Sequence, residues 1–183
     1  DLSIFYGDRC VANGISLTLN RGDRIALVGR NGCGKSSLLK LLIGQPIAHT
    51  GTLEIGSRLT VSYVPQDMSF LSGSADNFAA ESEIDITLFK TILRKLDFKR
   101  TQFTKDMSEF SMGQKKKVLL ARSLCQRANL YIWDEPLNYI DVISRLQIET
   151  LILEYKPTML FVEHDEAFVN DIATKVCRIS LNQ

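Results

Sequence analysis

The sequence predicts an α/β fold in which a mostly parallel sheet is flanked by helices. Three observations lead to this prediction. Short apolar segments alternate with helical patterns, especially over residues 130–179. These apolar segments are nearly continuous, as expected for strands buried on both faces of a parallel sheet. The composition, 45% hydrophobic and 23% charged, is that of a globular protein, and 183 residues fit one domain with a small appended lobe.

The first third of the chain is dominated by strand patterns. We expect strands at residues 2–6, 15–19, 24–28, 51–55 and 60–64, from their alternating or β-branched runs. Residues 20–23, with the sequence NRGD, form a turn between two of them. A helix follows at 36–43, where four leucines indicate burial on most sides. Since an expected strand begins at residue 2, we interpret the sequence as part of a longer polypeptide.

The composition changes between residues 68 and 110, where charge increases and β-branched runs become rare. Residues 87–96 have helical spacing, and with Ile86 just before them, Phe89, Ile92, Leu93 and Leu96 fall on one face. We interpret 68–110 as a small helical lobe inserted into an α/β core formed by residues 1–67 and 111–183. The whole chain is then one domain.

The last third returns to alternation. Helices are expected at 111–122, 142–154 and 166–172, and strands at 130–133, 159–162 and 175–179. These elements supply the parallel strands and covering helices of the predicted fold.

The charge and residue composition exclude several classes of protein. Twenty-two basic and 21 acidic residues give a net charge of +1, without the excess of a dedicated nucleic-acid binder. The apolar segments are too short for a membrane span, and the beginning of the sequence does not resemble a secretory signal. The four cysteines are far apart, which favours reduced thiols in the cytoplasm over disulfides or a zinc site.

The strongest motif is the sequence GRNGCGKSS at residues 29–37, which matches G-x-x-x-x-G-K-S/T between an expected strand and an expected helix. Such a loop turns backbone N–H groups and a helix N-terminus toward phosphate oxygens. Lys35 would reach the β- and γ-phosphates, Ser36 would bind Mg²⁺, and Ser37 would contact the α-phosphate. The alternative is a simple tight turn. The nucleotide-binding residues predicted within this loop are Gly29, Asn31, Gly32, Cys33, Gly34, Lys35, Ser36 and Ser37.

A second motif is the sequence LYIWDEP at residues 130–136, a buried strand that ends in two carboxylates. Asp134 is the natural partner of Mg²⁺, and Glu135 is the candidate general base for an attacking water. Alone, such a pair often does no more than cap a helix. In the same chain as a phosphate loop, it predicts nucleotide hydrolysis.

With these motifs, the chain resembles the nucleotide-binding domain of the ABC ATPases over essentially its whole length. The resemblance implies a P-loop NTPase core with an antiparallel β subdomain and a helical lobe. It also implies roles for single residues. Tyr6 would stack on adenine, Gln66 would contact Mg²⁺ and the attacking water, and His164 would contact the γ-phosphate. Ser111, Gly113 and Gln114 match the family's signature motif, which acts on nucleotide bound to a partner domain.

Each of these residues also has a purely structural interpretation: a strand-edge aromatic for Tyr6, a surface turn for Gln66, a core histidine for His164 and a helix N-cap for Ser111. Two further residues need an interpretation: Met112 departs from the family pattern, and Cys33 is a cysteine within the phosphate loop. Met112 occupies a position where many members have glycine, and it could crowd the partner's nucleotide. Cys33 lies near a helix N-terminus, which favours a reactive thiolate that ATP would protect, unless the residue simply fills space.

The resemblance implies an ATPase that works as half of a pair, with a second ABC domain in the same chain or in a dimer. Among ABC ATPases, the sequence is most like the C-terminal domain of an ABC-F protein of the antibiotic-resistance type. ABC-F proteins of this type act on the ribosome in the cytoplasm, and the resemblance implies the same role here. Residues 136–141 and 162–169 resemble the ABC-F versions of these segments, and the 43 residues between Gln66 and Phe110 leave no room for a long helical arm. The alternative is the ATP-binding subunit of a membrane transporter, peripheral to the membrane.

Three consecutive lysines, Lys115, Lys116 and Lys117, follow the signature motif. They could approach RNA or acidic headgroups, but a solvated helix face is the favoured interpretation. The resemblance also implies that the main ribosome contacts come from a linker between two ABC domains, which we do not expect in this sequence. The isolated chain is therefore expected to bind nucleic acid weakly or not at all.

Overall fold

A computed structural model describes residues 1–179 of the chain. It divides into two compact units. The first contains Asp1–Tyr63, Ala128–Asp134 and Lys156–Gln183, and the second contains Val64–Arg127 and Glu135–Tyr155. The second unit thus includes the helical stretch at 68–110 together with the two long helices that follow it, and each unit is described by itself below.

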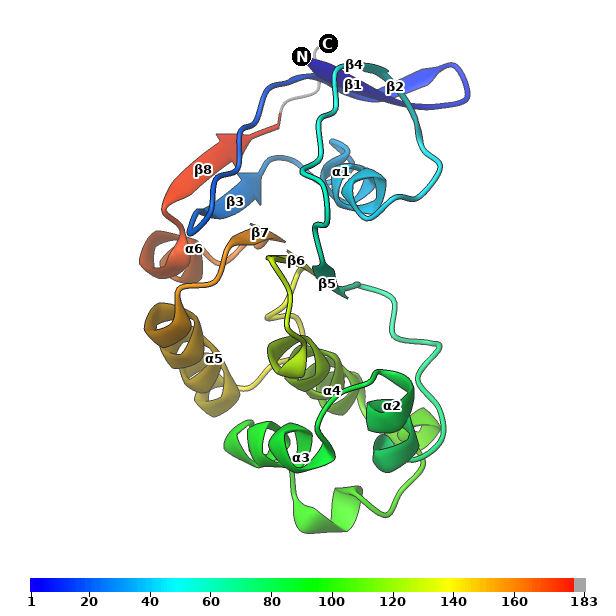
Figure 1. Cartoon of the computed structure of the whole chain (residues 1–183), viewed down its shortest axis with the longest axis vertical. Coiled ribbons are helices and arrows are strands. Elements are labelled where there is room, and N and C mark those ends of the chain that lie inside the picture. Colours follow the sequence, from blue (N-terminus) through cyan, green and yellow to red (C-terminus); the bar gives the residue numbers. More distant parts are fainter. Residues whose placement is uncertain (180–183) are drawn as a thin grey trace. The chain divides into compact units, whose positions relative to one another are not determined.

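The first unit is built on a five-stranded sheet with strand order β5-β6-β7-β3-β8 (Figure 1). Its strands are β5 (Val61–Val64), β6 (Leu130–Asp134), β7 (Met159–Val162), β3 (Arg24–Val28) and β8 (Lys175–Arg178). β6, β7, β3 and β8 pair in parallel. The predicted α/β class, with a mostly parallel sheet, is confirmed.

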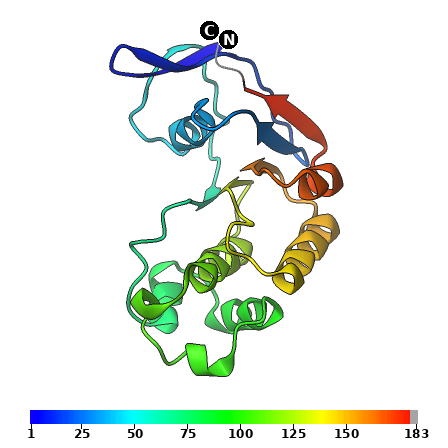
Figure 2. The same ribbon diagram turned by 180° about the vertical axis from the view of Figure 1, so that it is seen from behind.

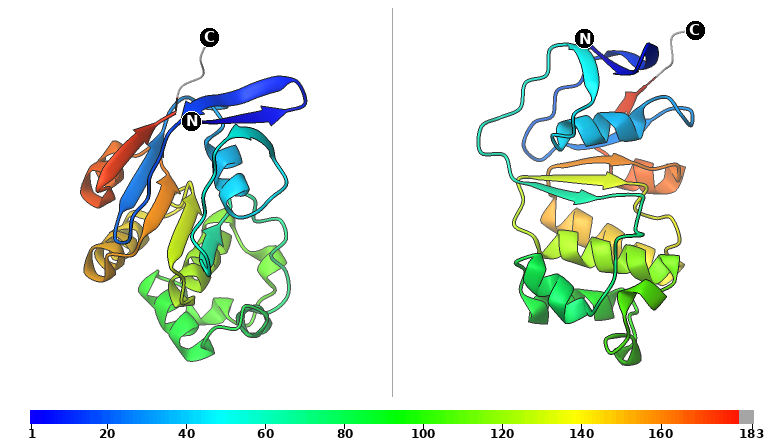
Figure 3. Two further views of the ribbon diagram at one scale, coloured as in Figure 1. Left: turned by 45° about the horizontal axis from the view of Figure 1, so that its top comes forward. Right: turned by 90° about the vertical axis from the view of Figure 1, so that its right-hand side faces the viewer.

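A three-stranded antiparallel sheet, of order β2-β1-β4, completes the strands of this unit. It consists of β1 (Leu2–Tyr6), β2 (Arg9–Ile15) and β4 (Ala48–Gly51). Helix α1 (Lys35–Leu42) lies beside this sheet in Figure 3. The leucines of α1 share one apolar core with side chains of the antiparallel sheet and of β3, β6 and β7. Helix α6 (Glu166–Ile172) packs Phe168 edge-on against Phe161 of β7, with ring centroids 5.6 Å apart.

Two strand predictions were wrong. Residues 16–19 are not a strand, because Ile15 already pairs with Leu2, where the partner strand β1 begins. Residues 52–55 are not a strand either. β4 ends at Gly51, whose φ of +93° interrupts the extended backbone and whose position opposite Leu2 leaves no space for a side chain.

The second unit is helical, with α2 (Ala75–Glu81), α3 (Ile86–Lys95), α4 (Met112–Cys125) and α5 (Val142–Tyr155). Two short 3₁₀ turns, Arg100–Gln102 and Met107–Glu109, lie between α3 and α4. α3 packs on α4 (Figure 2). The aromatic rings of Phe98 and Phe110 meet edge to face, with centroids 5.4 Å apart. Four members of the apolar face predicted for α3 are buried: Phe89, Ile92, Leu93 and Leu96. The fifth, Ile86, is the first residue of the helix and is exposed, so the prediction was wrong for it. Among residues 1–179, no helix is both long and apolar enough to cross a bilayer.

Candidate nucleotide-binding and hydrolysis site

The loop between β3 and α1 has the conformation that the glycine-rich motif requires. Gly32 and Gly34 have φ values of +79° and +85°, which residues with a Cβ rarely adopt. Gly34 is the N-cap of α1, and a Cβ there would lie 2.7 Å from the Cβ of Ala12 and 3.0 Å from the carbonyl oxygen of Val11. The loop therefore needs glycine at position 34 for both its backbone conformation and its contact with β2.

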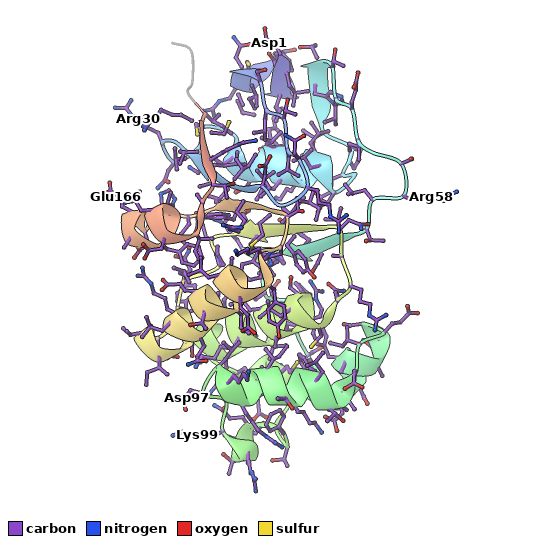
Figure 4. The ribbon with its side chains drawn as sticks, turned by 60° about the vertical axis from the view of Figure 1, so that its left-hand side comes forward. Asp1, Arg30, Arg58, Asp97, Lys99 and Glu166 are labelled. Atoms are coloured by element: carbon purple, nitrogen blue, oxygen red, sulfur yellow. The ribbon has the colours of Figure 1, made fainter. Side chains whose placement is uncertain are left out.

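Lys35 is the first residue of α1, and its side chain turns back into the loop. The residue is 6% exposed, and its Nζ donates hydrogen bonds to the carbonyl oxygens of Gly29 at 2.8 Å and Arg30 at 3.0 Å. A buried ammonium is stable only with such partners. The neighbouring Arg30 side chain points outward from the loop (Figure 4). The ammonium of Lys35 is thus held inside the loop, where phosphate oxygens would replace or join the carbonyls.

Cys33 does not have the exposed surroundings expected of a reactive thiol. It is 1% exposed and belongs to the apolar core beneath the loop. Its Sγ would lie 2.8 Å from a Cβ added at Gly29. The structure supports the space-filling role, and alkylation is expected to be slow with or without nucleotide.

Three neighbouring strands bring candidate residues to one edge of the sheet. Leu27 of β3 and Asp134 of β6 both pair with Val162 of β7, so the three strands end at the same level. Parallel strands lie about 4.8 Å apart, and ligands bind at their carboxyl ends in open α/β sheets. The phosphate loop, Asp134 and the segment of His164 therefore leave the sheet side by side.

Asp134 is buried, with 1% of its surface exposed, at the end of β6. Burial, followed by the charge of Asp134, raises the pKa of Tyr63 to about 12. The side chain of Asp134 therefore lies near the half-buried Tyr63. A buried carboxylate at this edge matches the proposed partner of Mg²⁺.

His164 is exposed just after β7. Its backbone N–H donates to the carboxylate of its neighbour Glu163 at 2.7 Å, and Glu163 is itself only 5% exposed. Asp165 then caps α6 by accepting a hydrogen bond from the N–H of Phe168. Held by this turn, His164 is not the core histidine of the alternative interpretation.

Tyr6 ends β1 and has half of its surface exposed. Its strand belongs to the same unit as the phosphate loop, and β2 touches that loop through Val11 and Ala12. An exposed ring on this sheet is compatible with the predicted stacking on adenine.

The second unit holds the remaining candidate residues. Gln66 is exposed in the loop after β5. Glu135 is half-buried, has the left-handed φ of +50°, and accepts a 2.5 Å hydrogen bond from the side-chain amide of Asn138. A non-glycine residue in this conformation costs about 1–3 kcal/mol and is typical of functional loops. The sequence did not reveal Asn138 as the side chain that holds the candidate base.

The signature residues form the start of α4. Ser111 is the N-cap, accepts a hydrogen bond from the N–H of Gln114 at 3.3 Å, and donates its own N–H to the side chain of Gln114 at 3.0 Å. Gly113 lies against the loop after Glu135, because a Cβ there would be 2.5 Å from the carbonyl oxygen of Tyr139. Met112 is 45% exposed on the first turn. The sequence-based N-cap interpretation of Ser111 describes its conformation in the single domain.

The interpretation of the three lysines as a solvated face is wrong for two of them. Lys116 is 1% exposed and Lys117 is 8% exposed. Lys116 donates to the carbonyl oxygen of Pro65 at 3.2 Å, and Lys117 forms a 2.5 Å ion pair with Asp141. The helical period contained the signal, since Leu120 and Ala121, one turn further on, are fully buried.

The candidate site residues have side chains of the kind that bind Mg²⁺ and a nucleoside triphosphate. Mg²⁺ prefers oxygen ligands and is usually held by one or two protein groups together with substrate phosphates. Ser36 and Asp134 offer such oxygens in the first unit, and Gln66 offers one in the second. Within residues 1–179, no three His, Cys, Asp or Glu side chains gather as a metal site.

Comparisons with known proteins identify the family. The family model described as ABC transporter matches residues 12–138. The putative ATP-binding protein YdiF of Bacillus subtilis is 36% identical, over 98% of this chain and 29% of its own length. ABC transporter F family member 2 of Arabidopsis thaliana is 29% identical, over 95% of this chain and 26% of its own length. The ribosome protection protein VmlR of Bacillus subtilis is 28% identical, over 97% of this chain and 33% of its own length.

This chain therefore spans about three-tenths of the length of these relatives. Among solved structures, the ATP-binding subunit of an ABC transporter superposes with a TM-score of 0.79 at 22% identity, over 99% of this chain and 86% of its own. This likeness confirms the predicted fold. The chain belongs to the ABC family of ATP-binding domains, with relatives of the ABC-F type.

Proposed function

We propose that this chain binds Mg-ATP and hydrolyses it to ADP and phosphate as one half of a paired ABC ATPase. The observation that carries the proposal is the glycine loop with the side chain of Lys35 turned into it. This loop leaves the sheet at the same edge at which β6 ends with Asp134. Family membership and the name of the ATP-binding relative YdiF support it.

The first unit supplies nucleotide binding. Lys35 leaves the loop carbonyls to meet the β- and γ-phosphates, and the backbone N–H groups at the start of α1 bind the phosphate oxygens. Ser36 and Asp134 would hold Mg²⁺, and Gln66 of the second unit would be a further oxygen donor. The metal ion supplies charge neutralisation on the phosphates when it is bound. Tyr6 stacks on the adenine ring.

The second unit supplies the groups for hydrolysis. Glu135 accepts the proton of the attacking water, and Asn138 orients its carboxylate until the water arrives. His164, from the first unit, donates to the γ-phosphate as charge develops there. Ser111, Gly113 and Gln114 contact the nucleotide of a second domain, so the isolated chain is expected to bind ATP but hydrolyse it slowly.

We propose further that the whole protein works on the ribosome, with closure of the two domains driven by ATP and reversed by hydrolysis. The relative named as a ribosome protection protein and the ABC-F character of residues 136–141 support this role. The second ABC domain would reside in the same chain, consistent with the greater length of the relatives. Such a protein would be cytoplasmic.

Co-sedimentation with ribosomes tests this role. The Glu135→Gln variant of the whole protein, loaded with ATP, is expected to pellet with ribosomes, because closure without hydrolysis traps the bound state. Lys35→Ala is the control, since it cannot be loaded. If the trapped variant stays in the supernatant and is recovered instead in a detergent-solubilised membrane complex, the transporter alternative is correct.

A further inference from the structure

Two buried lysines follow the signature motif on α4, and each reaches a different loop of the second unit. Lys116 contacts the loop of Gln66, and Lys117 contacts the loop that begins at Glu135. Both loops carry residues of the proposed reaction, while neither lysine is placed in that reaction.

The contact of Lys116 is made to the peptide bond that precedes Gln66. Its Nζ donates to the carbonyl oxygen of Pro65 at 3.2 Å, and the side chain is almost completely buried. Because a peptide unit is planar, fixing the oxygen of Pro65 also fixes the direction of the N–H of Gln66. The exposed side chain of Gln66 therefore starts from a backbone position that Lys116 determines.

The contact of Lys117 is made to the last residue of the loop after Glu135. Asp141 accepts the hydrogen bonds of Lys117 at 2.5 Å and of the N–H of Ser144 at 2.9 Å, where it caps the start of α5. The Oγ of Ser144 lies 2.9 Å from the carbonyl oxygen of Leu96, at the end of α3. The loop is thus attached to α4 and to two further helices.

Placing an ammonium group in a protein interior is unfavourable unless its partners compensate for the lost hydration. In some proteins, such a buried group contributes conformational specificity rather than stability. Here the two groups are consecutive, so one turn of a rigid helix holds both loops. This turn begins five residues after Ser111, or about 7.5 Å along the helix axis.

We propose that Lys116 and Lys117 are positioning residues that attach the Gln66 loop and the Glu135 loop to the signature helix. The three segments then move as one body, so that a nucleotide contacting Ser111 and Gly113 also sets the positions of Gln66 and Glu135. This inference rests on the proposed function for its effect on hydrolysis, and on the contacts alone for its effect on the loops.

Hydrogen exchange on the nucleotide-free whole protein tests the attachment without any reaction. In Lys116→Met, exchange of the backbone amides at residues 66–69 should accelerate about tenfold, as expected when a charge-assisted hydrogen bond is lost. In Lys117→Met, the acceleration should occur at residues 138–141 instead. Lys115→Met is the matched control, because this lysine is adjacent in the sequence but only half-buried; it should change neither loop.

Kinetics test the consequence. Lys116→Met should lower kcat about tenfold and raise the Mg²⁺ concentration needed for half-maximal rate, while ATP affinity stays within twofold because the phosphate loop is intact. Lys116→Arg, which keeps the charge and donors, should restore both values in part. A uniform acceleration of exchange over all amides in Lys116→Met would indicate general destabilisation of that variant. Exchange at residues 138–141 in Lys117→Met would then decide whether the lysines hold the loops.

The inference is overturned if Lys116→Met and Lys117→Met match Lys115→Met in exchange at their respective loops. It is also overturned if the loops loosen while kcat and its Mg²⁺ dependence are unchanged. Absence of ATP hydrolysis in the unmodified whole protein would instead contradict the proposed function and leave the exchange result valid.

Discussion

The phosphate loop at residues 29–37 and the signature segment at residues 111–117 are both glycine-containing starts of helices, but they depend on different parts of the chain. In the phosphate loop, backbone conformation dominates, since Gly32 and Gly34 have left-handed φ values. In the signature segment, packing dominates, since Gly113 lies against the carbonyl of Tyr139. Glycine thus provides conformational freedom in the first region, whereas it allows close approach in both, at Gly34 and at Gly113.

The two regions also use lysine differently. Lys35 is buried among carbonyl oxygens of its own loop, within six residues of its position. Lys116 is buried against a carbonyl 51 residues away. A local partner creates a motif that can be found in the sequence, whereas a distant partner leaves a lysine that resembles surface charge. The following variants test these differences between the phosphate loop and the signature segment.

The largest effect is expected for Lys35→Ala. Under the proposed function, the variant would lose the charge-assisted hydrogen bonds of Lys35 to the phosphates, so ATP affinity should fall at least about a hundredfold, with hydrolysis lost as well. Titration calorimetry measures the affinity. The control is Lys40→Ala, an exposed lysine on the same helix, which should bind ATP normally. Equal affinity in the two variants would contradict the role of Lys35.

The next largest effect separates two glycines of one loop. Gly34→Ala combines a left-handed φ with close contacts to Ala12 and Val11, so the free energy of unfolding should fall by about 2–4 kcal/mol. Gly32→Ala has the same kind of φ but open space around it, and should cost about 1 kcal/mol. Urea denaturation of both variants measures the difference. Equal losses would mean that conformation alone determines the requirement for glycine.

Gly113→Ala tests closeness of approach in the second region. Alanine favours the helix by up to about 1 kcal/mol, while its Cβ pushes on the carbonyl of Tyr139. Stability should therefore change little, and ATP turnover should fall about tenfold because the loop carrying Glu135 is displaced. Gly56→Ala, which has open space around it, is the control. Unchanged turnover in Gly113→Ala would show that the contact is irrelevant to hydrolysis.

The smallest effect concerns acid stability. Burial alone would raise the pKa of Asp141, but hydrogen bonds from Lys117 and Ser144 outweigh it and lower the pKa to about 2. The ionised carboxylate therefore stabilises the fold above its ordinary value of 3.8, and this stabilisation is lost as the pH falls toward 2. Because Asp141 is partly exposed, the effect is about 1 kcal/mol or less.

The Asp141→Asn variant isolates this contribution. Its unfolding free energy should be lower than that of the unmodified protein at neutral pH, and the two should converge as the pH falls toward 2. Denaturant titrations at several pH values measure both curves. A constant difference between them would assign the stabilisation to hydrogen bonding alone.

Most of the fold was predictable because its determinants are local. The run before the phosphate loop, the leucines of α1 and the apolar run ending at Asp134 identify their elements without knowledge of partners. The ends of strands were harder. Ile15 and Gly51 end their strands because of where Leu2 lies, and such pairing is not written in either segment.

The candidate site shows the same division. The sequence identified Lys35, Asp134 and Glu135 as parts of motifs whose spacing is local. It did not identify Asn138 as the partner of Glu135, nor the burial of Lys116 and Lys117. The contacts of Lys116 and Lys117 arise where α4 meets two loops from other parts of the chain, so tertiary packing determines them. The contact of Asn138 is local, but it depends on the left-handed backbone at Glu135, which no motif indicated.

The division of work between binding and hydrolysis is tested most directly by the Glu135→Gln variant of the whole protein. Glutamine preserves the shape of the side chain and its ability to accept the hydrogen bond of Asn138, but it cannot take a proton from water. ATP affinity should stay within about twofold while turnover falls at least a hundredfold. Turnover close to that of the unmodified protein would contradict the assignment of Glu135 as the base.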